Sequence, residues 1–134
     1  MNTNLSSKDI LELAITKHKK QDLLEAEKLY QEVLNKDKNN FNANFLLGTL
    51  FASIKKFESA IIRLEKAKAL NPNNADTHNN LGNVYKELNN IKFAKENYFL
   101  ALKIDLGSVI ISPLIIPCTC ILLSALSDML IIRL

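Results

Sequence analysis

A repeat period of about 34 residues constrains the fold of this chain more than any other feature of its sequence. Several columns of similar residues recur at this interval. In order along the repeat, the columns are Leu13, Leu47 and Leu81; Ala14, Gly48 and Gly82; Ala26, Ala60 and Ala94; Tyr30, Leu64 and Tyr98; and Val33, Ala67 and Ala101. Because one unit of this length cannot bury its apolar face alone, about three units must stack on one another.

Each unit has the pattern of two helices. Apolar residues recur at three- and four-residue steps, most clearly in residues 57–70 and 91–102, and this spacing marks one face of a helix. Short polar breaks separate the helices. Pro72 ends one of them, because proline lacks an amide hydrogen and cannot continue a helix interior. The sequence therefore predicts an all-α solenoid with helices near residues 7–19, 23–36, 41–54, 57–70, 75–88 and 91–104.

The small and large residues of the columns suggest how the helices pack. We expect Gly48 and Gly82 to let the first helix of a pair approach the second closely, with Ala60 and Ala94 on the other side of that approach. The larger side chains, which are Tyr30, Leu64, Tyr85 and Tyr98, are expected to fill the gaps between neighbouring pairs.

These residues resemble the tetratricopeptide repeat family, whose unit is a pair of antiparallel helices. The third repeat matches best, through Asn80-Leu81-Gly82-Asn83-Val84-Tyr85 and then Ala94, Tyr98 and Ala101. The second repeat keeps Leu47-Gly48, Phe51, Ala60, Leu64, Ala67 and Pro72. The first is degenerate, with Lys17 in place of the usual aromatic residue and Lys38 in place of the usual proline. The expected organisation is a polar lead at 1–6, repeats at 7–40, 41–74 and 75–105, and an apolar tail at 106–134.

The resemblance implies a right-handed superhelix with a concave groove that binds a segment of a partner protein. The first helix of each pair would line this groove. Carried over position by position, the groove residues would be Leu11, Ile15 and His18; Phe45, Thr49 and Ala52; and Asp76, Asn79, Asn80, Asn83 and Lys86.

Two specialised forms of that groove are not expected here. One subgroup of the family clamps a C-terminal carboxylate with lysine, arginine and asparagine, but the equivalent positions of this chain hold Leu11, Ile15, Thr49 and Asn79. Another subgroup holds a peptide backbone with a ladder of asparagines. Asn80 sits at a ladder position, whereas Leu46 and Glu12 occupy the others, so at most one rung is present.

No pattern in the sequence indicates catalysis. There is no Ser-His-Asp arrangement and no glycine-rich phosphate loop. His18 and His78 lack a second ligand at helical spacing, so we expect each to be a surface or groove residue and expect neither a metal nor a cofactor. The net charge of +3 is too small to indicate a nucleic-acid partner.

The last segment departs from the repeat pattern. From Leu106 to Ser127 no residue is charged, which is long enough for a membrane-spanning helix. However, Pro113 and Pro117 interrupt the segment, and the Val109-Ile110-Ile111 run favours a strand. Three interpretations stay open for residues 106–134: a membrane anchor, an apolar cap over the last repeat, or the abnormal end of a truncated or frame-shifted longer protein.

The function expected from the sequence is a non-catalytic scaffold or adaptor that binds a protein or peptide. One alternative is the targeting module of a truncated larger enzyme of glycosyl- or sulfotransferase type, and another is a tail-anchored membrane adaptor. The polar N-terminus, Met1 to Ile10, has no signal-peptide core, so we expect a cytoplasmic location. The last repeat could also stack on a second copy of the chain, because its apolar face needs cover.

Overall fold

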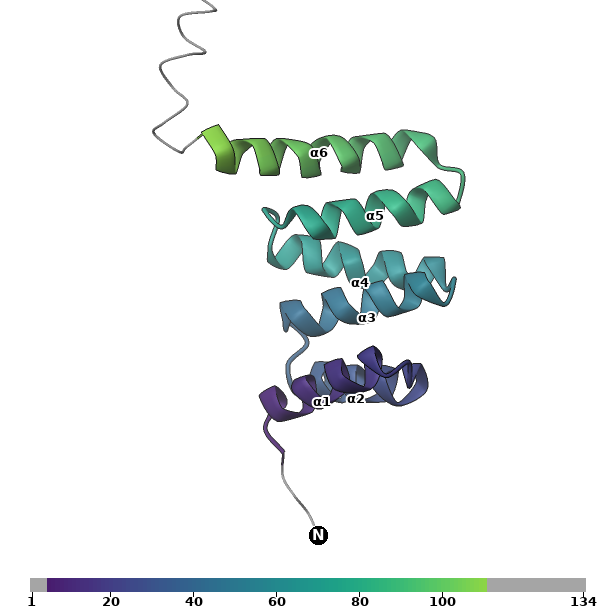
Figure 1. Cartoon of the computed structure of the whole chain (residues 1–134), viewed down its shortest axis with the longest axis vertical. Coiled ribbons are helices and arrows are strands. Elements are labelled where there is room, and N and C mark those ends of the chain that lie inside the picture. The colour runs from purple at the N-terminus through teal and green to yellow at the C-terminus, as the bar shows by residue number, and fades with distance from the viewer. Residues whose placement is uncertain (1–4, 111–134) are drawn as a thin grey trace, which may run out of the picture.

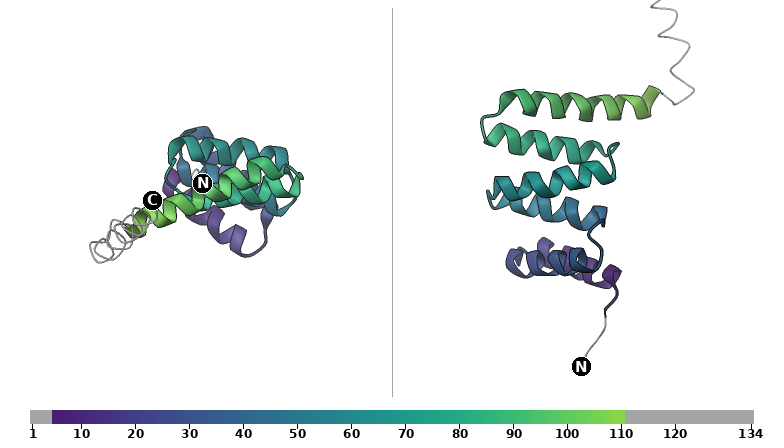
Figure 2. Two further views of the ribbon diagram at one scale, coloured as in Figure 1. Left: turned by 90° about the horizontal axis from the view of Figure 1, so that it is seen from above. Right: turned by 180° about the vertical axis from the view of Figure 1, so that it is seen from behind.

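The computed structural model describes residues 5–110, which form six α-helices stacked in chain order (Figure 1). They are α1 (Ser7–Lys19), α2 (Leu23–Lys36), α3 (Phe41–Ser53), α4 (Phe57–Leu70), α5 (Ala75–Glu87) and α6 (Ile91–Ile110). The closest packing is within the pairs α1–α2, α3–α4 and α5–α6, and each pair lies on the next. Views from above and from behind show the same single stack (Figure 2). Residues 5–110 contain no strand, and the predicted all-α solenoid is confirmed.

The end of α6 differs from the prediction. Every helix begins at its expected residue, but α6 continues to Ile110 instead of ending near residue 104. The reason is local: Leu106 stands where the second repeat has the helix-ending Pro72. The strand expected around Val109 and Ile110 is therefore wrong, because these two residues are helical.

The first helix of each pair begins with a capping side chain at the same point of the repeat. Ser6 accepts a hydrogen bond from the backbone of Asp9, Asn40 from that of Ala43, and Asn74 from that of Thr77. These caps satisfy amide hydrogens that the helix itself leaves unpaired. Successive caps lie one repeat period apart, so the period fixes the helix starts as well as the core.

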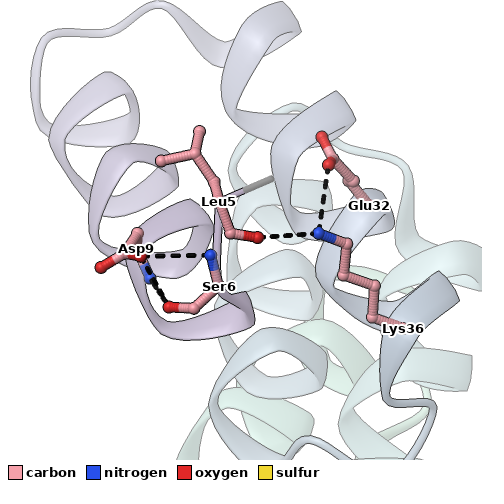
Figure 3. Close-up of polar contacts among 5 residues, drawn as sticks. All are labelled: Leu5, Ser6, Asp9, Glu32 and Lys36. Atoms are coloured by element: carbon pink, nitrogen blue, oxygen red, sulfur yellow. Dashed lines mark hydrogen bonds and ion pairs between the residues drawn. The ribbon is translucent and has the colours of Figure 1, made fainter. Parts of the chain in front are cut away.

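The N-terminal cap is also tied to the second helix (Figure 3). Ser6 and Asp9 form a reciprocal capping box, in which the Ser6 hydroxyl and amide both donate to Oδ2 of Asp9, at 2.7 Å and 3.1 Å. These bonds lower the pKa of the Asp9 carboxyl below its ordinary value. Lys36 of α2 donates to the carbonyl oxygen of Leu5 at 2.9 Å and lies near Glu32. The chain entering α1 is thus held against α2.

The short turns within pairs share a strained backbone conformation. Gln21, Lys55 and Asn89 have φ angles of 62°, 61° and 57°, in the left-handed region. All three occupy the same position of the repeat. Only asparagine among them is well suited to this conformation, so the turns at Gln21 and Lys55 are held by the helices on either side.

A continuous apolar core runs through the stack, with Tyr30, Leu47, Leu64 and Leu81 fully buried. Leu13 departs from its column, because it is 40% exposed whereas Leu47 and Leu81 are inaccessible. Helices α2 and α4 pack on α3 and α5, but among residues 5–110 no helix precedes α1. The same position of the repeat is therefore buried inside the stack but exposed in the first repeat, at the end of the stack.

The opposite end of the stack exposes more apolar area. Six large apolar side chains of α6 are at least 41% exposed: Ile91, Phe93, Phe99, Leu100, Leu102 and Leu106. Within the described range, no further helix follows to cover them. The anchor, cap and abnormal-end interpretations concern residues 106–134, of which 111–134 lie outside the described range. None of the helices in residues 5–110 is long and apolar enough to cross a membrane.

The expected role of the glycines is confirmed, although their contact partners differ from the prediction. A Cβ atom at Gly48 would lie 2.7 Å from Cγ of Leu64, and one at Gly82 would lie 2.6 Å from Cε1 of Tyr98. Leu64 and Tyr98 thus meet the glycines inside their own helix pair. They do not only fill gaps between pairs, and Ala60 and Ala94 are not the nearest side chains.

We expect Gly82→Ala to destabilise the fold by about 1–3 kcal/mol, because the added methyl group cannot fit beside the Tyr98 ring. Gly107→Ala is the matched control. No atom lies within 4 Å of the Cβ position at Gly107, and alanine favours a helix over glycine by up to about 1 kcal/mol. Urea unfolding followed by circular dichroism measures both changes. Equal stability of Gly82→Ala and the wild type would contradict the close approach.

Candidate partner-binding groove

The residues predicted to line the groove all lie on α1, α3 and α5, the first helices of the three pairs. None of the eleven is buried. Leu11, Ile15, His18, Phe45, Thr49, Ala52, Asn79 and Asn80 are partly exposed, and Asp76, Asn83 and Lys86 are exposed. Each side chain therefore remains available to a partner. That these residues bind one stays a prediction.

The α1 part of the groove is mainly apolar. Leu11 and Ile15 pack partly against the core, and His18 lies at the C-terminal end of the same helix. Nδ1 of His18 is 3.3 Å from the hydroxyl oxygen of the buried Tyr30, and the two rings meet edge to face. Burial lowers the pKa of His18 and raises the pKa of Tyr30 to about 12. Both groups are therefore uncharged near neutral pH.

The predicted groove residues of α3 contact their neighbours through a ring pair and two hydrogen bonds. The Phe45 ring stacks on Phe41 at a centroid distance of 5.9 Å. Thr49 donates its hydroxyl hydrogen to the carbonyl oxygen of Phe45 at 2.9 Å and accepts a hydrogen bond from Nδ2 of Asn80 at 3.1 Å. This last bond links α3 to α5, so the structure brings these two predicted groove residues together.

The α5 part of the groove is polar. Asn83 accepts a hydrogen bond from the Tyr98 hydroxyl at 2.7 Å, which fixes its amide from the side of α6. Asp76 and Lys86 are exposed, and neither forms an ion pair within residues 5–110. The groove residues therefore change along the stack, from apolar on α1 and α3 to hydrogen-bonding and charged on α5.

His78 is not a surface or groove residue, and that prediction is wrong. It is only 4% exposed, and its Nε2 donates to the carbonyl oxygen of Pro72 at 3.0 Å. Asn44, at the equivalent position of α3, is also buried, although we had not singled it out from the sequence. The sequence does contain a signal for this burial: Asn44 and His78 share a repeat column with the apolar Ile10.

Protonation of His18 should reduce the stability of the fold. We expect its pKa, followed by NMR in the full chain, to lie below the ordinary 6.5. The unfolded chain then takes up the proton first as the pH falls, so the free energy of unfolding decreases below about pH 6.5. The His18→Gln variant should lose this part of the pH dependence. Equal slopes for variant and wild type between about pH 5 and 7 would contradict the assignment.

Two family models and several solved structures match the chain. A family model described as TPR repeat matches residues 50–89, and one described as Tetratricopeptide repeat matches residues 75–107. No curated protein matches the sequence.

Among solved structures, MamA MSR-1 is 25% identical over 77% of this chain, with a TM-score of 0.71. This chain spans only 59% of that protein's length. A Thermobaculum terrenum O-GlcNAc transferase mutant is 30% identical over 73% of this chain, with a TM-score of 0.70, but only 19% of the transferase is covered.

The first TPR of Spaghetti (RPAP3), bound to the HSP90 peptide SRMEEVD, is 21% identical over 73% of this chain and 78% of its own, with a TM-score of 0.71. At that identity, the likeness shows the fold alone. The repeat columns, the helix pairs and the two family models agree, and residues 50–107 are tetratricopeptide repeats.

Proposed function

We propose that this chain is a non-catalytic scaffold that binds an extended segment of a partner protein across α1, α3 and α5. The observation that carries the proposal is that all eleven groove side chains remain exposed or partly exposed on the first helices of the pairs. The bond between Asn80 and Thr49 holds two of these helices in register. A preorganised row of side chains loses little conformational freedom when a partner binds.

The polarity of the groove suggests what kind of segment fits. Leu11, Ile15 and Phe45 would contact apolar side chains of the partner. Asn79 and Asn80 can donate and accept hydrogen bonds at once, as a peptide backbone requires. We therefore expect a segment that is apolar at the end bound by α1 and has free backbone amides at the end bound by α5.

A second candidate function is the targeting module of a larger transferase. It is supported by the 30% identity to the O-GlcNAc transferase mutant, of which this chain covers 19%. In that case the repeats would select the protein substrate for a catalytic domain elsewhere. Coding sequence that continues the repeats after Asp105 in another reading frame would favour this candidate, and a lack of such continuation would count against it.

Partner contact through the groove can be tested by photo-crosslinking in cells. We expect a benzoylphenylalanine at Lys86 to give partner adducts, and one at Lys92 on α6 to give none. Asn83→Ala should reduce the Lys86 adducts about fivefold, since one lost hydrogen bond is worth about 1 kcal/mol. Tyr98→Phe is the matched control, because it removes the same internal bond and leaves the groove lining unchanged.

Two results would contradict the groove assignment. One is adduct formation that is equally strong at Lys92, and the other is an equal loss of adducts in Asn83→Ala and Tyr98→Phe. The peptide SRMEEVD serves as a specificity control. We expect it not to compete, because Leu11, Ile15, Thr49 and Asn79 stand at the positions where a carboxylate clamp needs lysine, arginine and asparagine.

Localisation remains a proposal: a cytoplasmic scaffold, attached to a membrane if residues 106–134 are an anchor. Liposome flotation of the whole chain, compared with a chain ending at Asp105, tests the anchor. If it exists, only the whole chain floats and resists alkaline extraction. If both chains stay in the dense fraction, the anchor is excluded, and the cap and the abnormal end remain.

A further inference from the structure

A hollow lies where α2, the start of α3 and α4 meet, apart from the predicted groove residues. Its volume is about 570 Å³, which is within the usual range of ligand sites. The lining residues that matter here are Leu34, Lys38, Asn44, Ile62, Arg63 and Lys66. None of the eleven groove residues contributes to it.

An unpartnered polar group is buried at this hollow. Asn44 is inaccessible to solvent, and its Nδ2 donates to the carbonyl oxygens of Asn40 and Lys38, at 2.9 Å and 3.2 Å. No group in residues 5–110 donates to its Oδ1. Turning the amide over would place Oδ1 against two carbonyl oxygens, so the observed orientation is the correct one. Buried polar atoms are nearly always hydrogen-bonded, so this unpaired oxygen is an unusual feature of the wall behind the hollow.

The third repeat has a different pair of side chains at this place. His78 lies one repeat period after Asn44 and donates in the same way, to the carbonyl oxygen of Pro72. Its other ring nitrogen is 3.3 Å from Oδ1 of Asn97 on α6, which is the second helix of the same pair. Asn97 in turn lies one repeat period after Arg63. The second repeat thus has a cationic arginine where the third has a neutral asparagine.

The charges around the hollow are of one sign. Lys38, Arg63 and Lys66 line it, and within residues 5–110 none of them forms an ion pair. An apolar wall completes it, because Leu34 is buried and Ile62 is 67% exposed. The hollow therefore offers cations for an anion beside the exposed apolar surface of Ile62. Arginine is the residue best suited to bind a carboxylate with two parallel bonds.

We propose that this hollow binds an acidic peptide segment. A glutamate or aspartate carboxylate pairs with Arg63 and Lys66, and a neighbouring aliphatic side chain of the segment covers the exposed Ile62. Inorganic phosphate would satisfy the cations but would leave the apolar wall uncovered. The site is separate from the groove and does not depend on it, so the two proposals stand or fall independently.

The test uses the full chain and a fluorescein-labelled peptide, Leu-Glu-Glu-Leu-Glu, with its glutamine counterpart Leu-Gln-Gln-Leu-Gln. We expect binding of the acidic peptide in fluorescence anisotropy, weakening as salt is raised. Arg63→Gln should reduce the affinity about tenfold, since it removes a charge-assisted pair. Lys92→Gln makes the same change of charge outside the hollow and should have no effect. The groove variant Asn83→Ala should also bind normally.

A double variant, Asn44→His with Arg63→Asn, places the side-chain pair of the third repeat in the second. We expect it to bind the acidic peptide at least about tenfold more weakly, because it lacks the Arg63 guanidinium. If it melts lower, Arg63→Gln and Lys66→Gln carry the test instead.

Four results would overturn the proposal. The first is a wild type that does not bind at about 1 mM peptide. The second is a glutamine peptide that binds equally well, and the third is an Arg63→Gln variant with wild-type affinity. The fourth is displacement of the peptide by inorganic phosphate at the concentration at which unlabelled peptide displaces it, which would reduce the hollow to a simple anion site.

Discussion

The close approach of the two helices in a pair is the contact on which the rest of the stack depends. At Gly48 and Gly82 there is no room for even a methyl group, because Leu64 and Tyr98 fill the space. With the two helices held this close, their remaining apolar side chains form one face that the next pair can cover. Tyr98 then reaches past Gly82 to Asn83. A packing constraint inside the pair thus positions a side chain predicted to contact a partner.

The repeat period made most of the fold predictable, because it is a property of local sequence. It placed the starts of all six helices, and the capping residues Ser6, Asn40 and Asn74 recur at the same interval. The failures occur where a neighbour decides the outcome. Leu13 has the sequence of a core residue, but no helix precedes α1 in the described range. The extension of α6 to Ile110 has a local cause instead, since Leu106 stands where the second repeat has Pro72.

The helices that carry the candidate groove residues were predictable, but the contacts of those residues were not. Carrying positions over from the family placed eleven side chains on the correct helices, and none of them is buried. It could not reveal that Asn80 is bonded to Thr49, or that His78 faces inward to Pro72. Asn80 and Thr49 are 31 positions apart, so their bond depends on how two repeats stack. His78 and Pro72 are close in sequence, but side-chain polarity alone does not show that a histidine points inward.

In the hollow where α2, α3 and α4 meet, one position of the repeat carries different side chains in the second and third repeats. Asn44 and His78 occupy the same place, and each ties the start of its helix to the preceding loop by one hydrogen bond. What differs is the partner of the remaining polar atom. Asn97 is short and meets His78, whereas Arg63 is long and charged and leaves the Asn44 oxygen unpaired. Because each repeat contacts only its neighbours, such an exchange opens one position without loosening the others.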